Sequence, residues 1–167
     1  MKTIKDFLSE SLTPNKTTPV NENDCAVNWC ADPSFSNDPD VFSDEMDGYL
    51  DELEGNITPQ SIKRAYHVSD DKVGTYSNIA LAVVADIRGI VDGIRDDGSK
   101  IDDNIIRMLA SYIDPKSDRV DAVIDSEGFD DADVVDVFKN WNKFVKAATG
   151  NEWVDVRALQ KDHGIRL

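Results

Sequence analysis

The stretch Ser77–Asp97, SNIALAVVADIRGIVDGIRDD, decides the fold of this chain. Its apolar residues recur at steps of three and four, which places them along one side of an α-helix: Ile79, Val83, Ile87, Ile90, Val91 and Ile94. The pattern predicts a long helix that starts at Thr75 or Ser77 and ends at Gly98.

Two glycines, Gly89 and Gly93, lie inside this predicted helix. A glycine in a helix interior costs about 1 kcal/mol relative to alanine, so each calls for a structural reason. We expect a neighbouring helix to pack closely against the two glycines, with a kink in the helix as the alternative.

The remainder of residues 57–167 shows the same helical periodicity and no convincing alternating segment of the kind that forms a strand. Cap and break signals delimit further helices over Pro59–His67, Ser99–Ile113, Ser117–Asp125, Asp130–Ala148 and Glu152–Asp162. We therefore predict an all-α fold, a small helical bundle of about five to six helices.

The apolar stripe over Asp130–Ala148 predicts one continuous helix that stops at Thr149–Gly150. Three lysines fall together on its outer side, toward its C-terminal end: Lys139, Lys143 and Lys146. Cations at that end of a helix suit its dipole.

Acidic residues dominate the chain, which has 167 residues, 18 Lys and Arg, 33 Asp and Glu, and a net charge of −15. The excess is uneven, because residues 1–10 are neutral, residues 11–56 carry −10 and residues 57–167 carry −5. Much of the middle region is rich in proline and polar residues, which bury too little apolar surface to order. We interpret the three parts as a docking peptide, an irregular and partly disordered acidic segment, and a helical domain.

One amphipathic helix is predicted inside the acidic segment, over residues 40–54, with Gly55 as its C-terminal cap. We expect this helix to dock on the body of the protein or on a partner. Its candidate partner-binding residues are the acids Asp44, Glu45, Asp47, Asp51 and Glu52. They form either a solvated surface or a DNA mimic, which would occupy a DNA-binding cleft on another protein.

Composition and patterning exclude several classes of protein. An acidic surface repels phosphate backbones, so no direct nucleic-acid binding is expected. The longest apolar run, Ile79–Ala85, is too short to span a bilayer, so no membrane association is expected. The N-terminus lacks the apolar core of a secretory signal.

No set of residues predicts catalysis, a cofactor or a metal site. Cys25 and Cys30 would need two further soft ligands to bind zinc, and the only histidines, His67 and His163, lie in other segments. We interpret the cysteines as free thiols. The aspartate clusters within residues 96–121 do not match the register of an EF-hand, and the first of them fits helix capping. We therefore expect a protein that is not an enzyme.

The first ten residues, MKTIKDFLSE, carry the most specific pattern in the sequence. They resemble the capsid-targeting sequence of internal head proteins from T-even-type bacteriophages. That sequence reads Met-Lys-Thr, two variable residues, an acid, Phe, Leu or Ile, a variable residue and Glu. The residues that fit it are Lys2, Thr3, Asp6, Phe7, Leu8 and Glu10. The resemblance covers these ten residues and no others.

The resemblance implies that a prohead protease cuts the chain after Glu10, because Leu8 stands two residues before this glutamate and the small residue Ser11 follows it. From the residues alone, Ile4, Phe7 and Leu8 form one apolar side of a short helix. Such a segment would order on docking into a groove of a partner. The alternative is an ordinary amphipathic helix that packs on its own body.

These features predict a non-enzymatic bacteriophage virion protein, packaged through residues 1–10. The implied partners are the prohead scaffold or core and the prohead protease. The expected location is the capsid interior, with passage through the host cytoplasm during assembly or after ejection. Two alternatives stay open: an acidic phage inhibitor of a host defence or nucleic-acid enzyme, and a docked structural component of the virion.

Overall fold

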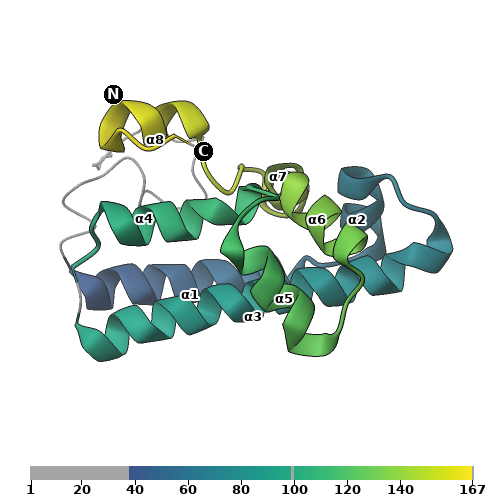
Figure 1. The fold of residues 1–167 in the computed structure, drawn as a ribbon, viewed down its shortest axis with the longest axis horizontal. Coiled ribbons are helices and arrows are strands. Elements are labelled where there is room, and N and C mark those ends of the chain that lie inside the picture. The colour runs from purple at the N-terminus through teal and green to yellow at the C-terminus, as the bar shows by residue number, and fades with distance from the viewer. Residues whose placement is uncertain (1–37, 99, 167) are drawn as a thin grey trace, which may run out of the picture.

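The computed structural model describes residues 38–98 and 100–166, and every regular element among them is helical (Figure 1). In chain order these elements are α1 (Pro39–Gly55), α2 (Pro59–Tyr66), α3 (Asp70–Asp97), α4 (Asp103–Ala110), the 3-10 helix η4 (Ser111–Ile113), α5 (Asp118–Glu127), α6 (Asp131–Lys139), α7 (Trp141–Thr149) and α8 (Val156–His163). The predicted all-α class is confirmed for this part of the chain.

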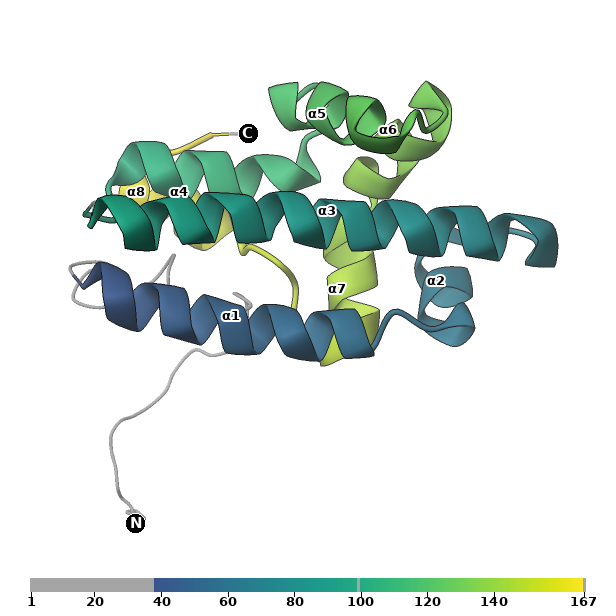
Figure 2. The same cartoon turned by 90° about the horizontal axis from the view of Figure 1, so that it is seen from below.

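Helix α3 is the longest of these elements and contacts α1, α2, α5 and α6. Helix α1 lies along α3 in the opposite chain direction (Figure 2). The same view shows α1 and α2 on one side of α3, with α5 and α6 on the other. Helix α7 leads from α6 back to α2, on which it packs. Helix α8 lies beyond α4, at an edge of the molecule (Figure 1).

The apolar stripe of α3 explains its central position. Five of the six residues predicted to form the stripe are buried, and Ile90 is partly buried against the same core. None of the described helices, α3 included, is both long enough and apolar enough to cross a membrane.

One hydrophobic core joins the helices. Its fully buried aromatic side chains come from α1, η4, α6, α7 and the segment before α8: Phe42, Tyr112, Phe138, Trp141, Phe144 and Trp153. Helix α1 also buries Met46, Leu50 and Leu53 completely. Of the two docking modes expected for the helix predicted over residues 40–54, the structure therefore has docking on the body.

The number of helices differs from the prediction. Eight α-helices are present among the described residues instead of about five to six, and the segment predicted as one helix over Asp130–Ala148 is two. The break falls at Asn140, whose backbone has φ −112° and ψ 18°. The Asn140 side chain donates to the backbone oxygen of Asp136 (3.3 Å) and to its Oδ1 (2.9 Å). Such local hydrogen bonds compete with continuation of a helix.

Helix α3 begins at Asp70, earlier than the predicted start at Thr75 or Ser77. Val73 and Tyr76 extend its buried side toward the N-terminus, which adds apolar burial to the extra turns. The acidic first turn also suits the positive end of the helix dipole.

Two helix caps fall on other residues than predicted. Helix α4 is capped by Asp102, whose side chain accepts a hydrogen bond from the backbone N of Ile105 (3.0 Å), whereas the prediction started this helix at Ser99. Helix α1 ends at Gly55, and its C-cap is Asn56.

The last helix starts at Val156 rather than at the predicted Glu152. The segment before α8 is held by long-range hydrogen bonds. The side chain of Asn142 forms two with the backbone of Val154 (3.1 and 3.0 Å). Trp153 Nε1 donates to the backbone oxygen of Leu109 (2.8 Å). These bonds hold two residues predicted to be helical, Trp153 and Val154, in a buried connection that is not helical.

The expectation of close packing at Gly89 and Gly93 is wrong. A Cβ atom built on either glycine meets no heavy atom within 4 Å outside its own stretch of helix. Helix α3 runs through both positions without a break (Figure 2). No neighbouring element therefore requires a glycine at these positions.

Replacing Gly89 by alanine is expected to raise the free energy of unfolding by about 0.5–1 kcal/mol, because alanine favours the helix and no neighbour obstructs its methyl group. Urea unfolding followed by circular dichroism measures the change. The control is Gly98→Ala, which should destabilise the protein because Gly98 has a φ of +61°. Equal loss of stability in both variants would contradict the prediction.

Candidate functional site

The predicted targeting and cleavage residues lie outside the described residues, which begin at Asp38. They are Lys2, Thr3, Asp6, Phe7, Leu8, Glu10 and Ser11, and the two cysteines, Cys25 and Cys30, lie outside as well. The candidate acids of α1 lie within the described residues, and their contacts with α3 show which of them are paired inside the protein.

Arg95 of α3 engages the acids of the N-terminal half of α1. Its Nη2 atom lies 2.7 Å from Asp47 Oδ2 and 3.2 Å from Asp44 Oδ1. Its Nη1 atom lies 3.5 Å from Oδ1 of Asp92 on its own helix. The hydrogen bond to Asp47 raises the pKa of Arg95 above its ordinary value.

Arg88 engages the acids of the C-terminal half of α1. Its Nη2 atom lies 2.7 Å from Asp51 Oδ1 and 3.1 Å from Glu54 Oε1, and its Nη1 atom lies 4.0 Å from Asp47 Oδ1. Arg88 and Arg95 are seven residues apart, so they fall on the same side of α3 after two turns. The acids of α1 recur at the matching spacing on the opposing helix.

The structure therefore divides the five candidate partner-binding acids into two groups. Asp44, Asp47 and Asp51 already pair with arginines of α3. Glu45 and Glu52 are exposed and have no ion pair among residues 38–98 and 100–166. The first group is paired within the protein, although Asp44 and Asp51 stay largely exposed, and the second group has no ion pair in these ranges.

Sequence reasoning missed the arginine partners and the fourth acid, Glu54. The available signal was the heptad spacing of Arg88 and Arg95 beside the apolar stripe of α3. A similar spacing of acids in α1 completes the pattern, but only the antiparallel packing of the two helices shows that they meet.

A second polar cluster links α3 to η4 and α5. Arg119 binds Asp86 with two bonds, from Nε to Oδ2 (2.9 Å) and from Nη2 to Oδ1 (2.7 Å). The hydroxyl of the fully buried Tyr112 donates to the same carboxylate. The hydrogen bond to Asp86 raises the pKa of Arg119 above its ordinary value. Since all its members are mutually satisfied, this cluster serves to join helices.

A third cluster joins α3 to α6. The Tyr76 hydroxyl donates to Asp136 Oδ2 (2.7 Å), and Lys72 Nζ lies 3.1 Å from Asp133. Beside them the buried Tyr66 hydroxyl donates to the backbone oxygen of Val137 (3.1 Å). These bonds fix α6 relative to α2 and α3.

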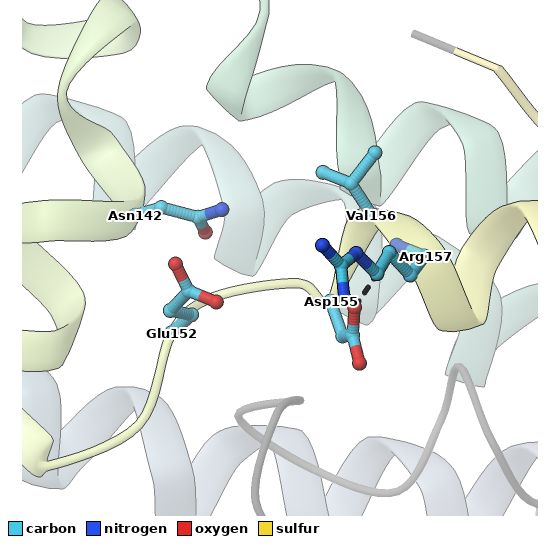
Figure 3. Close-up of a pocket in the computed structure, with 5 residues that line it drawn as sticks. All are labelled: Asn142, Glu152, Asp155, Val156 and Arg157. Carbon is cyan, nitrogen blue, oxygen red and sulfur yellow. Dashed lines mark hydrogen bonds between the residues drawn. The ribbon is translucent and has the colours of Figure 1, made fainter.

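An open pocket of about 360 Å³ lies between α7 and the start of α8 (Figure 3). Its lining residues are Asn142, Glu152, Asp155, Val156 and Arg157. The Asp155 side chain caps α8 by accepting from the backbone N of Arg157 (2.9 Å), and the Asn142 amide is bonded to the backbone of Val154. These two polar groups are therefore engaged in holding the local backbone.

The histidines also have structural positions. His67 is exposed and ends α2 with a φ of 54°, and His163 Nδ1 lies 3.3 Å from Asp103 Oδ1, which links α8 to α4. In the part of the chain that the structure describes, no group of three or more His, Cys, Asp or Glu side chains could hold a metal ion.

No family model, curated protein or solved structure matches this chain. Its function must therefore be argued from its own residues.

The four tyrosines of the protein should ionise only as it unfolds. Each hydroxyl is hydrogen-bonded, and burial raises the pKa of every one above 10: Tyr49, Tyr66, Tyr76 and Tyr112. The folded state keeps protons that the unfolded state loses near pH 10, so this contribution to stability is complete below pH 10 and is lost as the pH rises further.

An alkaline titration that follows phenolate absorbance and far-ultraviolet circular dichroism together measures this coupling. The two signals should change in one transition above pH 10, whereas the protein in guanidinium chloride should ionise near pH 10. Ionisation of the folded protein near pH 10 with an unchanged dichroism spectrum would show that the tyrosines are not held in this way.

Proposed function

We propose that this chain is a non-enzymatic bacteriophage virion protein that enters the prohead through its first ten residues. The observation that carries the proposal is the match of six residues to the capsid-targeting sequence of phage internal head proteins: Lys2, Thr3, Asp6, Phe7, Leu8 and Glu10. The prohead core would bind this decapeptide, and the prohead protease would cut after Glu10. The remaining protein would then lie in the capsid interior.

The arrangement of the body supports this division. The core of residues 38–166 is assembled from the side chains of its own helices and connections. Residues 11–37 separate that body from the decapeptide along the chain. Cutting the bond between Glu10 and Ser11 would remove none of the core residues that the structure describes, as suits a packaging signal that is discarded after use.

A reporter protein that carries residues 1–10 at its N-terminus is expected to enter phage heads, because the decapeptide is proposed to be sufficient for packaging. Replacing Phe7 and Leu8 by serine should lower incorporation at least tenfold, since these side chains are the proposed anchors. Fluorescence of purified heads measures the effect, and a scrambled decapeptide is the control. A reporter that stays out of the heads would remove the basis of the proposal.

Mass spectrometry of purified virions reports the N-terminal residue. Ser11 is expected after cleavage, and Glu10→Gln should leave Met1 in place. An uncut chain in wild-type virions would favour the alternative of a docked structural component.

The inhibitor alternative makes a separate prediction, because only Glu45 and Glu52 of the five candidate acids lack an ion pair in the described ranges. A host enzyme captured at equal stoichiometry should be lost from the double variant E45Q/E52Q. The control is D125N/E127Q, which makes the same change in charge at exposed residues of α5. Equal capture by both variants would argue against an inhibitor that acts through α1.

A further inference from the structure

Residues 56–69 and residues 137–151 are two long stretches of this acidic chain that contain no acid. Together they hold five cations and none of the 33 acidic residues: Lys63, Arg64, Lys139, Lys143 and Lys146. Another acid-free stretch of the same order of length, residues 72–85, holds a single cation, Lys72. Residues 56–69 and 137–151 differ from it because they combine several cations with no acid.

The fold brings the two stretches together. Helix α2 comes from the first and α7 from the second, and the two helices pack against each other (Figures 1 and 2). The rings of Tyr66 and Phe144 stack with their centroids 5.9 Å apart. The hydroxyl of Tyr66 bonds to the backbone of Val137, at the start of the second stretch. The two acid-free segments thus meet where α2 packs on α7.

The cations of this region point outward. Helix α7 buries Trp141, Phe144 and Val145, and its exposed lysines, Lys143 and Lys146, lie on the other side of the helix, three residues apart. Residues at that separation are neighbours on a helix surface. The cations of α2 and the lysine that ends α6 are exposed as well. We call these five residues, Lys63, Arg64, Lys139, Lys143 and Lys146, the basic face.

Four of the five cations are unmatched within the described ranges of the chain. Lys63 pairs with Asp70, whereas Arg64, Lys139, Lys143 and Lys146 have no ion pair there. Elsewhere in the body, Arg88 and Arg95 each bind two or more carboxylates, and Lys72 and Arg119 each bind one. The other cations of the described ranges also have no ion pair there: Lys100, Arg107, Lys116, Arg157, Lys161 and Arg166. The basic face differs from these because its cations come from acid-free stretches whose helices pack together, and exposed cations of this kind are complementary to an anionic partner.

We propose that the basic face binds an acidic helix of a partner protein. The α1–α3 contact shows the chemistry within this molecule, because there an acidic helix lies along cations that each bind carboxylates from successive turns. The basic face offers cations on two adjacent helices for the same kind of contact. This proposal concerns residues 38–166 and does not depend on the function of the decapeptide.

The size of the basic face favours a protein helix over a nucleic acid. Helices α2 and α7 have 8 and 9 residues, so each is only about 12–14 Å long. A duplex would extend past this face onto acidic surface such as the start of α3, where Asp70 and Asp71 are exposed. The net charge of −15 does not prevent local binding, because salt screens charges beyond about 8 Å at physiological ionic strength.

The test uses the full chain and a labelled helical peptide of alanine and glutamate, with glutamates three and four residues apart. Fluorescence anisotropy should show binding that weakens several-fold between about 50 and 200 mM salt, because the contact is ionic. The variant K143E/K146E should bind the peptide at least tenfold more weakly. The control K100E/K116E changes the charge equally at exposed lysines outside the basic face and should bind within twofold of wild type.

Folding of each variant is checked by its urea midpoint, and K143A/K146A provides a milder change at the same residues. Failure of the peptide to bind the wild-type chain would overturn the proposal, as would equal losses in the two charge-reversed variants. A short DNA duplex that binds more tightly than the peptide, and is lost in K143E/K146E, would reassign the face to nucleic acid. Self-association lost in that variant would reassign it to a second copy of the chain.

Discussion

The packing of α1 on α3 is the contact on which the rest of the structure depends, because it closes one side of the central helix. Four α1 side chains are completely buried: Phe42, Met46, Leu50 and Leu53. Burial of a side chain of this size contributes about 1.5–3 kcal/mol. An exposed ion pair contributes about 0–1 kcal/mol. Apolar burial therefore holds α1 in place, while Arg88 and Arg95 fix its direction and offset its charge.

This contact changes the meaning of the charge pattern. Along the chain, residues 11–56 carry most of the acidic excess, which makes α1 look like a free acidic surface. In the fold, the arginines that neutralise part of α1 come from the other region, whereas the acid-free stretches around α2 and α7 meet although they lie far apart in sequence. The distribution of charge along the sequence thus differs from its distribution on the folded surface. The proposed contact of the basic face with an acidic helix and the alternative contact of α1 with a host enzyme both depend on the folded surface.

Apolar periodicity was enough to predict the helical class and the ends of several helices, because a buried stripe requires one side of a helix. It could not predict the break at Asn140, because the stripe continues across it and the cause is a local bond to Asp136. It also could not place Trp153, which is held outside α8 by a bond to Leu109. The Arg88 and Arg95 pairs were missed for the same reason, since they depend on which helix lies beside α3.

Glycines with no packing role lie inside the two central helices. Four interior helix positions are glycines whose Cβ would meet nothing within 4 Å: Gly48, Gly74, Gly89 and Gly93. At about 1 kcal/mol each relative to alanine, they lower stability by about 4 kcal/mol. A typical domain has only about 5–15 kcal/mol in total. All four lie in α1 and α3, so they lower the helix propensity of these two helices without taking part in the contact between them. The stability of α1 and α3 therefore comes from burial of their apolar sides and not from helix propensity.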